Sequence, residues 1–256
     1  MSAGAEERPF GVAGTPLASW HASPELAQVP VVSLGELLPP GARLVVAAPH
    51  PDDEVLACGG LLAALAPRPQ AVTLLSVTDG DGSHPGSSLW PPARLRHERR
   101  QESTRALTRL GYDTRVLDWH PLSLPDGELA ACKSELLEHL CAHLNPSDRL
   151  LSTWRHDGHC DHETLGEVAA QAARLTGAVL IEAPVWAWHW AKPDDPRLPW
   201  ARARKFMLDE HTLARKRQAI AEHATQLHAD PSTQAPPVLA PETLGRLLQP
   251  FELVFI

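Results

Sequence analysis

From residue 43 onward, short apolar runs alternate with segments of helical periodicity, and this alternation constrains the fold more than any other feature. Short apolar runs of this kind suit buried β-strands. The expected strands are Leu44–Ala48, Ala71–Val77, Arg115–Trp119, Arg149–Thr153 and Ala178–Glu182. The expected helices are Val55–Leu65, Ala93–Leu110, Leu129–Leu144 and His162–Leu175. The order predicts right-handed crossovers between parallel strands, and therefore an α/β fold with a mainly parallel sheet between two helix layers.

The loops after the first and fourth expected strands are predicted to face each other. In the strand order 3-2-1-4-5 the winding reverses between strands 1 and 4, and ligands bind beyond the carboxyl ends of the strands at such a point. The first loop reads PHPDDE at residues 49–54, and the second reads HDGHCDH at residues 156–162. The first loop alone is also explained as a cluster that caps a helix N-terminus. Two such clusters at one crevice favour a functional site.

The residue types in these two loops suit a catalytic metal site. A catalytic zinc ion takes three protein ligands and keeps one position for water. His50 and Asp53 can supply two ligands from one side, and His162 can supply the third from the other. Asp52 and His159 then remain as unligated groups around the metal-bound water. This division of roles fits metal-assisted amide hydrolysis, in which a carboxylate takes the proton of the attacking water.

The two motifs together resemble those of the LmbE-like or PIG-L deacetylases. PHPDDE is followed by a helix that contains Gly59 and Gly60, and GHCDH follows at residues 158–162. Further similarity extends the resemblance over roughly residues 43–228, with matches in residues 99–102, 124–127 and 216–226. The resemblance implies a Rossmann-like three-layer sandwich. It also implies removal of an acetyl group from an N-acetylglucosamine-type conjugate, with a zinc-bound water as the nucleophile.

The resemblance assigns a role to each residue of the two loops. The implied ligands of a single zinc ion are His50, Asp53 and His162, and Fe²⁺ or another divalent ion would suit the same set. Asp52 is implied as the general base and His159 as the group that steadies the oxyanion or aids proton transfer. Asp161 is implied to orient His159. Cys160 stands where many relatives have proline, and Asp157 where some have an aromatic residue, so the substrate need not be the usual one.

Two residues outside the loops match positions that contact substrate hydroxyls in relatives. These are Arg99 and Asp126. Each also has a purely structural explanation. Arg99 would then pair with Glu102 one turn along its helix, and Asp126 would only begin the turn before Gly127.

Two further segments have both a functional and a structural interpretation. Trp186, Trp188 and Trp190 alternate, so their rings would share one face if the segment is extended. Such a face would bind a sugar ring or pack beneath the C-terminal region. The loop at residues 79–82 is either a lid over the crevice or a solvated loop.

Composition and patterning narrow the partners, the location and the domain organisation. A formal charge of −8 has the wrong sign for nucleic acid. The longest apolar run stops at Pro67, short of the roughly 20 residues of a membrane span. Residues 1–20 lack a signal-peptide pattern, so a cytoplasmic protein with a small-molecule partner is expected. We expect a proline-rich N-terminal arm at residues 1–40 with little of the core, and one domain at residues 41–256 with a peripheral C-terminal region.

Three other functions remain open at this point. The same fold would serve an amidase that cleaves another acyl group or a thiol-conjugate amide. Two histidines and one carboxylate also form the ligand set of non-heme iron oxygenases, although Asp52 already supplies the base that hydrolysis needs. A sugar-binding module without catalysis is disfavoured, because the chain retains the expected base and all three expected ligands.

Overall fold

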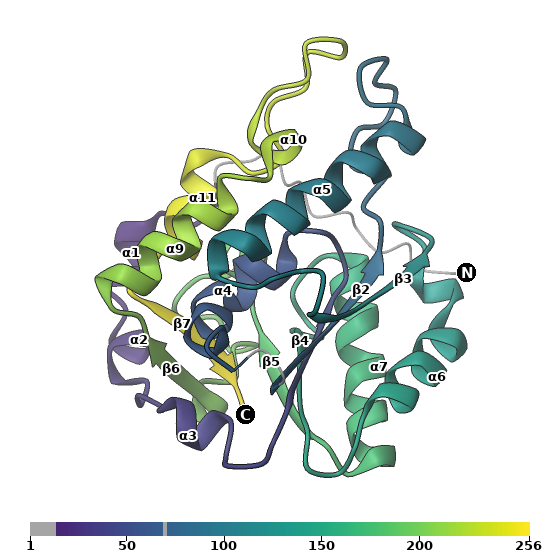
Figure 1. The fold of residues 1–256 in the computed structure, drawn as a ribbon. Coiled ribbons are helices and arrows are strands. Elements are labelled where there is room, and N and C mark those ends of the chain that lie inside the picture. The colour runs from purple at the N-terminus through teal and green to yellow at the C-terminus, as the bar shows by residue number, and fades with distance from the viewer. Residues whose placement is uncertain (1–13, 69–70) are drawn as a thin grey trace, which may run out of the picture.

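The computed structural model describes residues 14–68 and 71–256, which form a seven-stranded sheet with helices on both faces (Figure 1). The strands are β1 (Leu44–Ala48), β2 (Val72–Thr78), β3 (Asp118–Leu124), β4 (Arg149–Thr153), β5 (Val179–Ala183), β6 (Ala203–Met207) and β7 (Phe251–Phe255). The longer helices are α4 (Asp53–Leu65), α5 (Pro92–Leu110), α6 (Lys133–His143), α7 (Cys160–Thr176) and α9 (Glu210–Ile220). The shorter helices are α1 (Leu17–His21), α2 (Pro24–Gln28), α3 (Leu34–Leu37), α8 (Ala187–Trp190), α10 (Ala224–Leu227) and α11 (Pro241–Leu247). Within the described ranges, no helix combines the length and hydropathy needed to cross a bilayer.

The sheet has the strand order β3-β2-β1-β4-β5-β7-β6. The pairs among β1 to β5 are all parallel, whereas β7 runs antiparallel to β5 and to β6. The predicted α/β class and the order 3-2-1-4-5 are therefore confirmed, and β1 lies beside β4 as expected. The winding thus reverses where the two polar loops begin.

Successive side chains of the inner strands pack on opposite faces of the sheet. In β1, Leu44 and Val46 belong to the core beneath α4 and α5, whereas Val45 and Ala47 belong to the core beneath α6 and α7. This period of two follows from strand geometry. It explains why both residue sets are apolar, because a central parallel strand is covered on both faces.

Two predicted elements have different bounds in the structure. The third strand was expected at residues 115–119 but begins at Asp118, because residues 113–117 form a turn. In this turn Asp113 accepts hydrogen bonds from the backbone N–H groups of Arg115, Val116 and Leu117. The helix expected at residues 129–144 is divided into a 3₁₀ turn (Leu129–Ala131) and α6.

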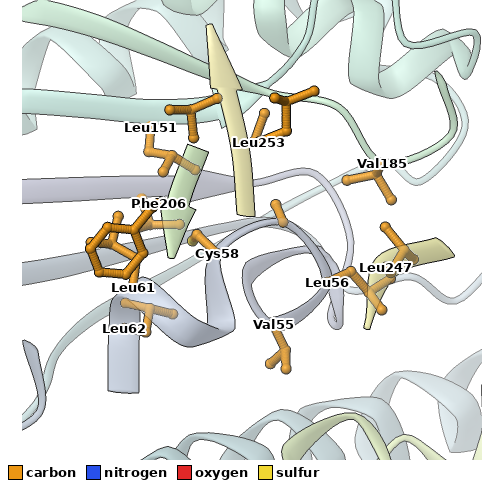
Figure 2. Packing of buried hydrophobic residues seen from close by; sticks show 14 of the residues in the cluster. Val55, Leu56, Cys58, Leu61, Leu62, Leu151, Val185, Phe206, Leu247 and Leu253 are labelled. Carbon is orange, nitrogen blue, oxygen red and sulfur yellow. The ribbon is translucent and has the colours of Figure 1, made fainter. Parts of the chain in front are cut away.

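The C-terminal region extends the sheet, which the sequence did not predict. β7 follows Pro250 and inserts between β5 and β6, and its Val254 and Phe255 are fully buried. Leu253 of β7 and Phe206 of β6 belong to the same apolar cluster as α4 (Figure 2). β6 escaped prediction because it lies at the sheet edge and carries charged residues, so its apolar signal is weak.

The N-terminal segment also differs from expectation where it is described. Trp20, Leu26 and Leu37 are buried in the main core, so the segment from residue 14 onward is part of the packed domain. The indole N–H of Trp20 donates to the carbonyl of Trp188, which anchors α1 on the C-terminal half. Residues 1–13 lie outside the described residues, and the division at residue 40 remains a prediction.

Helix α4, which carries part of the first polar loop, is broken at Cys58. Its φ of −143° and ψ of 26° are not helical, so nearby backbone groups lose their helical partners. Glu252 of β7 accepts hydrogen bonds from the N–H groups of Gly60 (2.6 Å) and Leu61 (2.8 Å). Lys216 of α9 donates to a carbonyl of the first piece at 2.9 Å and to Glu252 at 2.8 Å. The buried pair of Glu252 and Lys216 therefore supplies hydrogen-bond partners to the backbone groups freed at the break, and it links α4 to the C-terminal elements.

Candidate active site

A cavity of about 330 Å³ lies beyond the carboxyl ends of the parallel strands, where the two polar loops meet. The predicted site residues that line it are His50, Asp52, Asp53, Arg99, Asp126, His159 and His162. Other lining residues come from the loop after β2, from α10 and from the segment before α11; they include Gly82, Ser83, Gln226, Val238 and Leu239. Asp161 is the one predicted site residue that does not line the cavity.

Three side-chain atoms converge at the floor of this cavity. Asp53 Oδ2 lies 3.1 Å from His50 Nδ1 and 3.1 Å from His162 Nε2. The two imidazole nitrogens are 3.3 Å apart. Ligands about 2.0–2.1 Å from a tetrahedral ion are roughly 3.3 Å from one another, so this triangle has the dimensions of a metal site. His50 also belongs to two wider groups of possible ligands, one with His159 and His162 and one with Asp126 and Asp161.

The outer contacts of the two histidines support the same interpretation. His162 Nδ1 lies 2.8 Å from a carboxylate oxygen of Asp157, and His50 Nε2 lies 3.2 Å from Asp126 and from Asp161. Each of these outer nitrogens can donate its proton to a carboxylate, so His50 Nδ1 and His162 Nε2 are the nitrogens that could bind a metal ion once they are deprotonated. Two imidazole nitrogens and a carboxylate oxygen are a ligand set that suits a divalent ion, so this His/Asp cluster can bind a metal ion.

Asp157 holds His162, and the sequence analysis did not assign it this role. Its carboxylate is fully buried and also accepts backbone N–H groups of Val185, Trp186 and Ala187 at 2.9 Å. Burial lowers the pKa of His162, but Asp53 and Asp157 outweigh that effect and raise it to about 9. The signal was present in the sequence as an acidic residue five positions before the expected ligand.

Asp161 has a different side-chain partner from the one expected. Its carboxylate lies 3.2 Å from His50 Nε2 and accepts the N–H groups of Gly127 (2.7 Å) and Leu129 (3.2 Å). Its contact with His159 is made by the backbone, since the Asp161 N–H donates to His159 Nδ1 at 3.2 Å. The Asp161 side chain therefore orients His50.

His159 caps the N-terminus of α7 and faces the cavity. Because Nδ1 accepts from the backbone, the proton of the neutral ring is on Nε2. Burial, together with the nearby His162 and His50, lowers the pKa of His159 to about 3. The ring is therefore neutral near pH 7 and carries one N–H donor.

Asp52 occupies a backbone conformation that is rare outside glycine. Its φ is 146° and its ψ is −27°, which costs about 1–3 kcal/mol in a typical protein. Burial raises the pKa of Asp52 to about 7; Arg99 opposes this rise, whereas Asp53 and Glu54 add to it. A carboxylate with such a pKa is suited to exchange protons near neutral pH.

Arg99 lines the cavity, but its hydrogen bonds go to other groups of the protein. It donates to the carbonyls of Gly80 and Pro51 at 2.8 Å and to Asp52 Oδ2 at 3.1 Å. The alternative pairing with Glu102 is not formed, because Glu102 accepts instead from the backbone N–H and the hydroxyl of Thr225 at 2.7 Å. Neither of the two roles expected for Arg99, substrate contact or pairing with Glu102, included the contact with Asp52.

Asp126 combines the two interpretations offered for it. It precedes Gly127, whose φ of 79° marks a tight turn. Its carboxylate also faces the cavity, accepts the N–H of Gly82 at 2.7 Å and lies 3.2 Å from His50. The contact with Gly82 joins the loop after β2 to the cavity wall.

The tryptophan segment is helical, so the expected extended face is not formed. Residues 187–190 form α8, because the Asp157 carboxylate binds the N–H groups at its start. Trp186 lines the cavity, whereas Trp188 contacts the Trp20 ring at 4.9 Å. Trp190 stacks near Trp154 at 6.4 Å. The three rings therefore have separate surroundings.

Comparison with known proteins identifies the chain. The sequence profile of the PIG-L family, described as GlcNAc-PI de-N-acetylase, matches residues 44–173, just over half of the 256 residues. The chain belongs to the PIG-L family. The matched span contains both polar loops and all eight predicted site residues.

Individual relatives of this PIG-L protein are named as deacetylases. The 2'-N-acetylparomamine deacetylase of Streptomyces fradiae is 34% identical over 161 residues, which are 62% of this chain and 51% of that protein. A probable N-acetyl-alpha-D-glucosaminyl L-malate deacetylase 2 of Bacillus cereus is 30% identical over 135 residues, 51% of this chain and 60% of that protein. The chain thus spans little more than half the length of these curated relatives.

A solved structure supports the assignment of the PIG-L fold. The zinc-inhibited form of teicoplanin deacetylase aligns with a TM-score of 0.58 at 18% identity, covering 84% of this chain and 97% of that one. At this identity the likeness concerns the fold.

Proposed function

We propose that this PIG-L protein is a zinc-dependent deacetylase that hydrolyses the N-acetyl group of an amino-sugar conjugate. The observation that carries the proposal is the triangle of His50 Nδ1, Asp53 Oδ2 and His162 Nε2, with Asp52 beside it in the same cavity. Two relatives named as deacetylases of acetylated amino sugars support the substrate class. We also propose that residues 41–256 act as one catalytic domain.

The proposed ligands are His50, Asp53 and His162. When bound there, a zinc ion would polarise the amide carbonyl and lower the pKa of water, which is the usual contribution of this metal. Asp157 and Asp161 would fix the two imidazole rings by accepting their outer N–H protons.

Asp52 is the proposed general base. It lines the cavity next to Asp53, and its raised pKa of about 7 allows it to accept a proton from the attacking water near neutral pH. The same group can then deliver that proton to the departing amine. An asparagine side chain in place of Asp52 could not accept this proton, so the proposed proton transfer requires the carboxylate.

His159 is the proposed donor to the oxyanion. Its pKa of about 3 keeps the ring neutral, and its proton lies on Nε2 because Nδ1 accepts the backbone N–H of Asp161. A fixed neutral N–H donor stabilises the negative charge that develops on the carbonyl oxygen.

The rest of the cavity would receive the sugar. A volume of about 330 Å³ exceeds that of an acetyl group and is within the usual range for small-molecule sites. Asp126 provides a carboxylate for sugar hydroxyls, as its match to the family implies. Trp186, Leu239 and Leu56 supply an apolar wall for the face of a sugar ring.

Amine release from a panel of N-acetylated sugars tests the proposal directly. The panel should include mono-N-acetylated paromamine, an N-acetylglucosaminyl malate and N-acetylglucosamine, with a propionyl analogue to examine the acyl group. Activity should disappear with a chelator and return with one equivalent of zinc. Absence of amine release from every member, by zinc-loaded protein, would contradict the proposed function.

The metal and the reaction class can be separated from the substrate. Elemental analysis of the purified protein should find one divalent ion per chain, with zinc in excess over iron. Oxygen uptake by the iron-loaded protein is the matched control, because an oxygenase with two histidines and one carboxylate would consume oxygen.

A further inference from the structure

The strained residue Asp52 is held in place by a buried arginine from another element. Arg99 lies on α5, far from Asp52 in sequence, and its side chain is only 3% exposed. One guanidinium nitrogen donates both to the Pro51 carbonyl (2.8 Å) and to Asp52 Oδ2 (3.1 Å). The other donates to the Gly80 carbonyl (2.8 Å), so the guanidinium joins α5 to the loops after β1 and β2.

The backbone of Asp52 needs such an attachment. With φ at 146° the residue lies outside the regions that non-glycine residues ordinarily adopt, and the conformation persists only when its surroundings enforce it. Glu54 contributes the second restraint, since its buried carboxylate accepts the Asp52 N–H at 3.0 Å. Arg99 therefore holds the Pro51 carbonyl and the Asp52 side chain, and Glu54 holds the N–H of the same Pro51–Asp52 peptide unit.

Gly80 shows how closely the arginine is fitted. Its φ of 64° favours glycine, and a Cβ there would overlap the Arg99 guanidinium and approach Pro51 Cδ to 2.8 Å. The absence of a side chain at residue 80 is therefore a condition for the arginine to reach the turn.

We propose that Arg99 is a positioning residue that fixes the carboxylate of Asp52 for proton transfer. The inference rests on the proposed function, because Asp52 is the base only if the site hydrolyses an amide. It differs from the substrate-contact role implied by the family resemblance. The reason is that the guanidinium donates to two carbonyls and one carboxylate of the protein itself.

Kinetics of matched variants separate positioning from substrate binding. Arg99→Met should lower kcat by about 10²-fold, the typical result of a small misplacement of a catalytic group, and leave KM within about two-fold. Metal content should remain at the wild-type level. Gly80→Ala should reproduce the kcat loss with Arg99 still present, because its Cβ displaces the guanidinium.

Arg100→Met is the matched control. Arg100 is the next residue of the same helix and binds Asp79 in the same loop at 2.7 Å, but it does not line the cavity. Its loss should leave both kinetic constants near wild type. Arg99→Lys keeps the charge without the planar fork and should recover only part of kcat.

Hydrogen exchange supplies a readout that needs no substrate. In metal-free protein, the backbone amides of residues 52–54 should exchange at least ten-fold faster in Arg99→Met than in Arg100→Met. A failed substrate panel would leave this readout intact, so failure of the proposed function and failure of this inference are distinguishable. Unchanged exchange, a raised KM with kcat preserved, or loss of metal in proportion to activity would each overturn the positioning role.

Discussion

The turn after β1 and the loop after β4 meet at one cavity but are held in opposite ways. His162 lies in the regular first turn of α7, and the residue that orients it, Asp157, is five positions earlier in the same loop. Asp52 has a φ of 146° and depends on Arg99 from α5. The wall that carries the proposed ligand His162 is thus supported locally, whereas the wall that carries the proposed base is supported by a distant element.

This difference has an energetic reason. A residue with ordinary helical φ and ψ needs no restraint on its backbone, so a neighbouring carboxylate is enough to fix the side chain of a ligand. A strained turn is stable only when other parts of the structure restrain it. Single substitutions in the two walls should therefore have different effects on metal content and turnover.

Removal of a ligand from the locally supported wall should have the largest effect. His162→Ala deletes one of three proposed ligands, so metal content should fall close to zero and turnover should be lost. His156→Ala, in the same loop but outside the cavity lining, should keep both. Metal is measured by elemental analysis after dialysis, and full occupancy in His162→Ala would remove this residue from the ligand set.

Loss of the base should abolish most chemistry without loss of metal. Asp52→Asn cannot accept a proton, so kcat should fall about 10²–10⁴-fold while the metal remains. Because a base works only when ionised, wild-type activity should fall as the pH drops below about 7, the raised pKa of Asp52. The residual activity of Asp52→Asn should lack that acid limb. Asp53→Asn is the contrasting variant, and it should lose metal as well.

Weakening the support of His162 should have a smaller and different effect. Asp157→Asn removes the carboxylate that accepts the His162 Nδ1 proton, and metal affinity should fall about 10–100-fold. Competition with a chromophoric chelator measures this affinity. Glu163→Gln on the same helix should change it little. If Asp157→Asn binds metal as tightly as wild type, the proposed orientation of His162 by Asp157 is wrong.

The distant support should also make stability depend on pH. His223, which precedes α10, is fully buried; burial, with the charges of Arg99 and Arg105, lowers its pKa to about 3. The unfolded chain takes up this proton below about pH 6.5 and the folded chain does not, so the contribution to stability is lost as pH falls. Between pH 7.5 and pH 4, the unfolding free energy of the metal-free wild type should fall. The fall over the same pH range should be about 3 kcal/mol smaller in metal-free His223→Leu. Denaturant unfolding measures this, and equal slopes in the two proteins would contradict it.

The sequence alone predicted the parallel part of the sheet and the meeting of the two polar loops. Both depend on local patterns, because apolar runs of strand length and helical periodicity determine the order of elements, and that order determines which strands are neighbours. The prediction that His50, Asp53 and His162 come together followed from this order, and the structure brings their ligand atoms within 3.3 Å.

Tertiary structure decided the partners of the polar side chains. Spacing suggested Glu102 for Arg99, and the family resemblance implied His159 for Asp161, but the side chains contact Asp52 and His50 instead. Buried polar groups take whichever partner the packed elements bring within reach, and that distance is not encoded in neighbouring residues.

The same reason applies to the elements that the sequence missed. β7 is a short strand whose place between β5 and β6 depends on contacts across the whole chain. α8 is helical because a carboxylate from the loop after β4 binds the N–H groups at its start. Local patterning therefore determined the parallel part of the sheet and the location of the site, whereas long-range packing determined how the proposed base Asp52 is held.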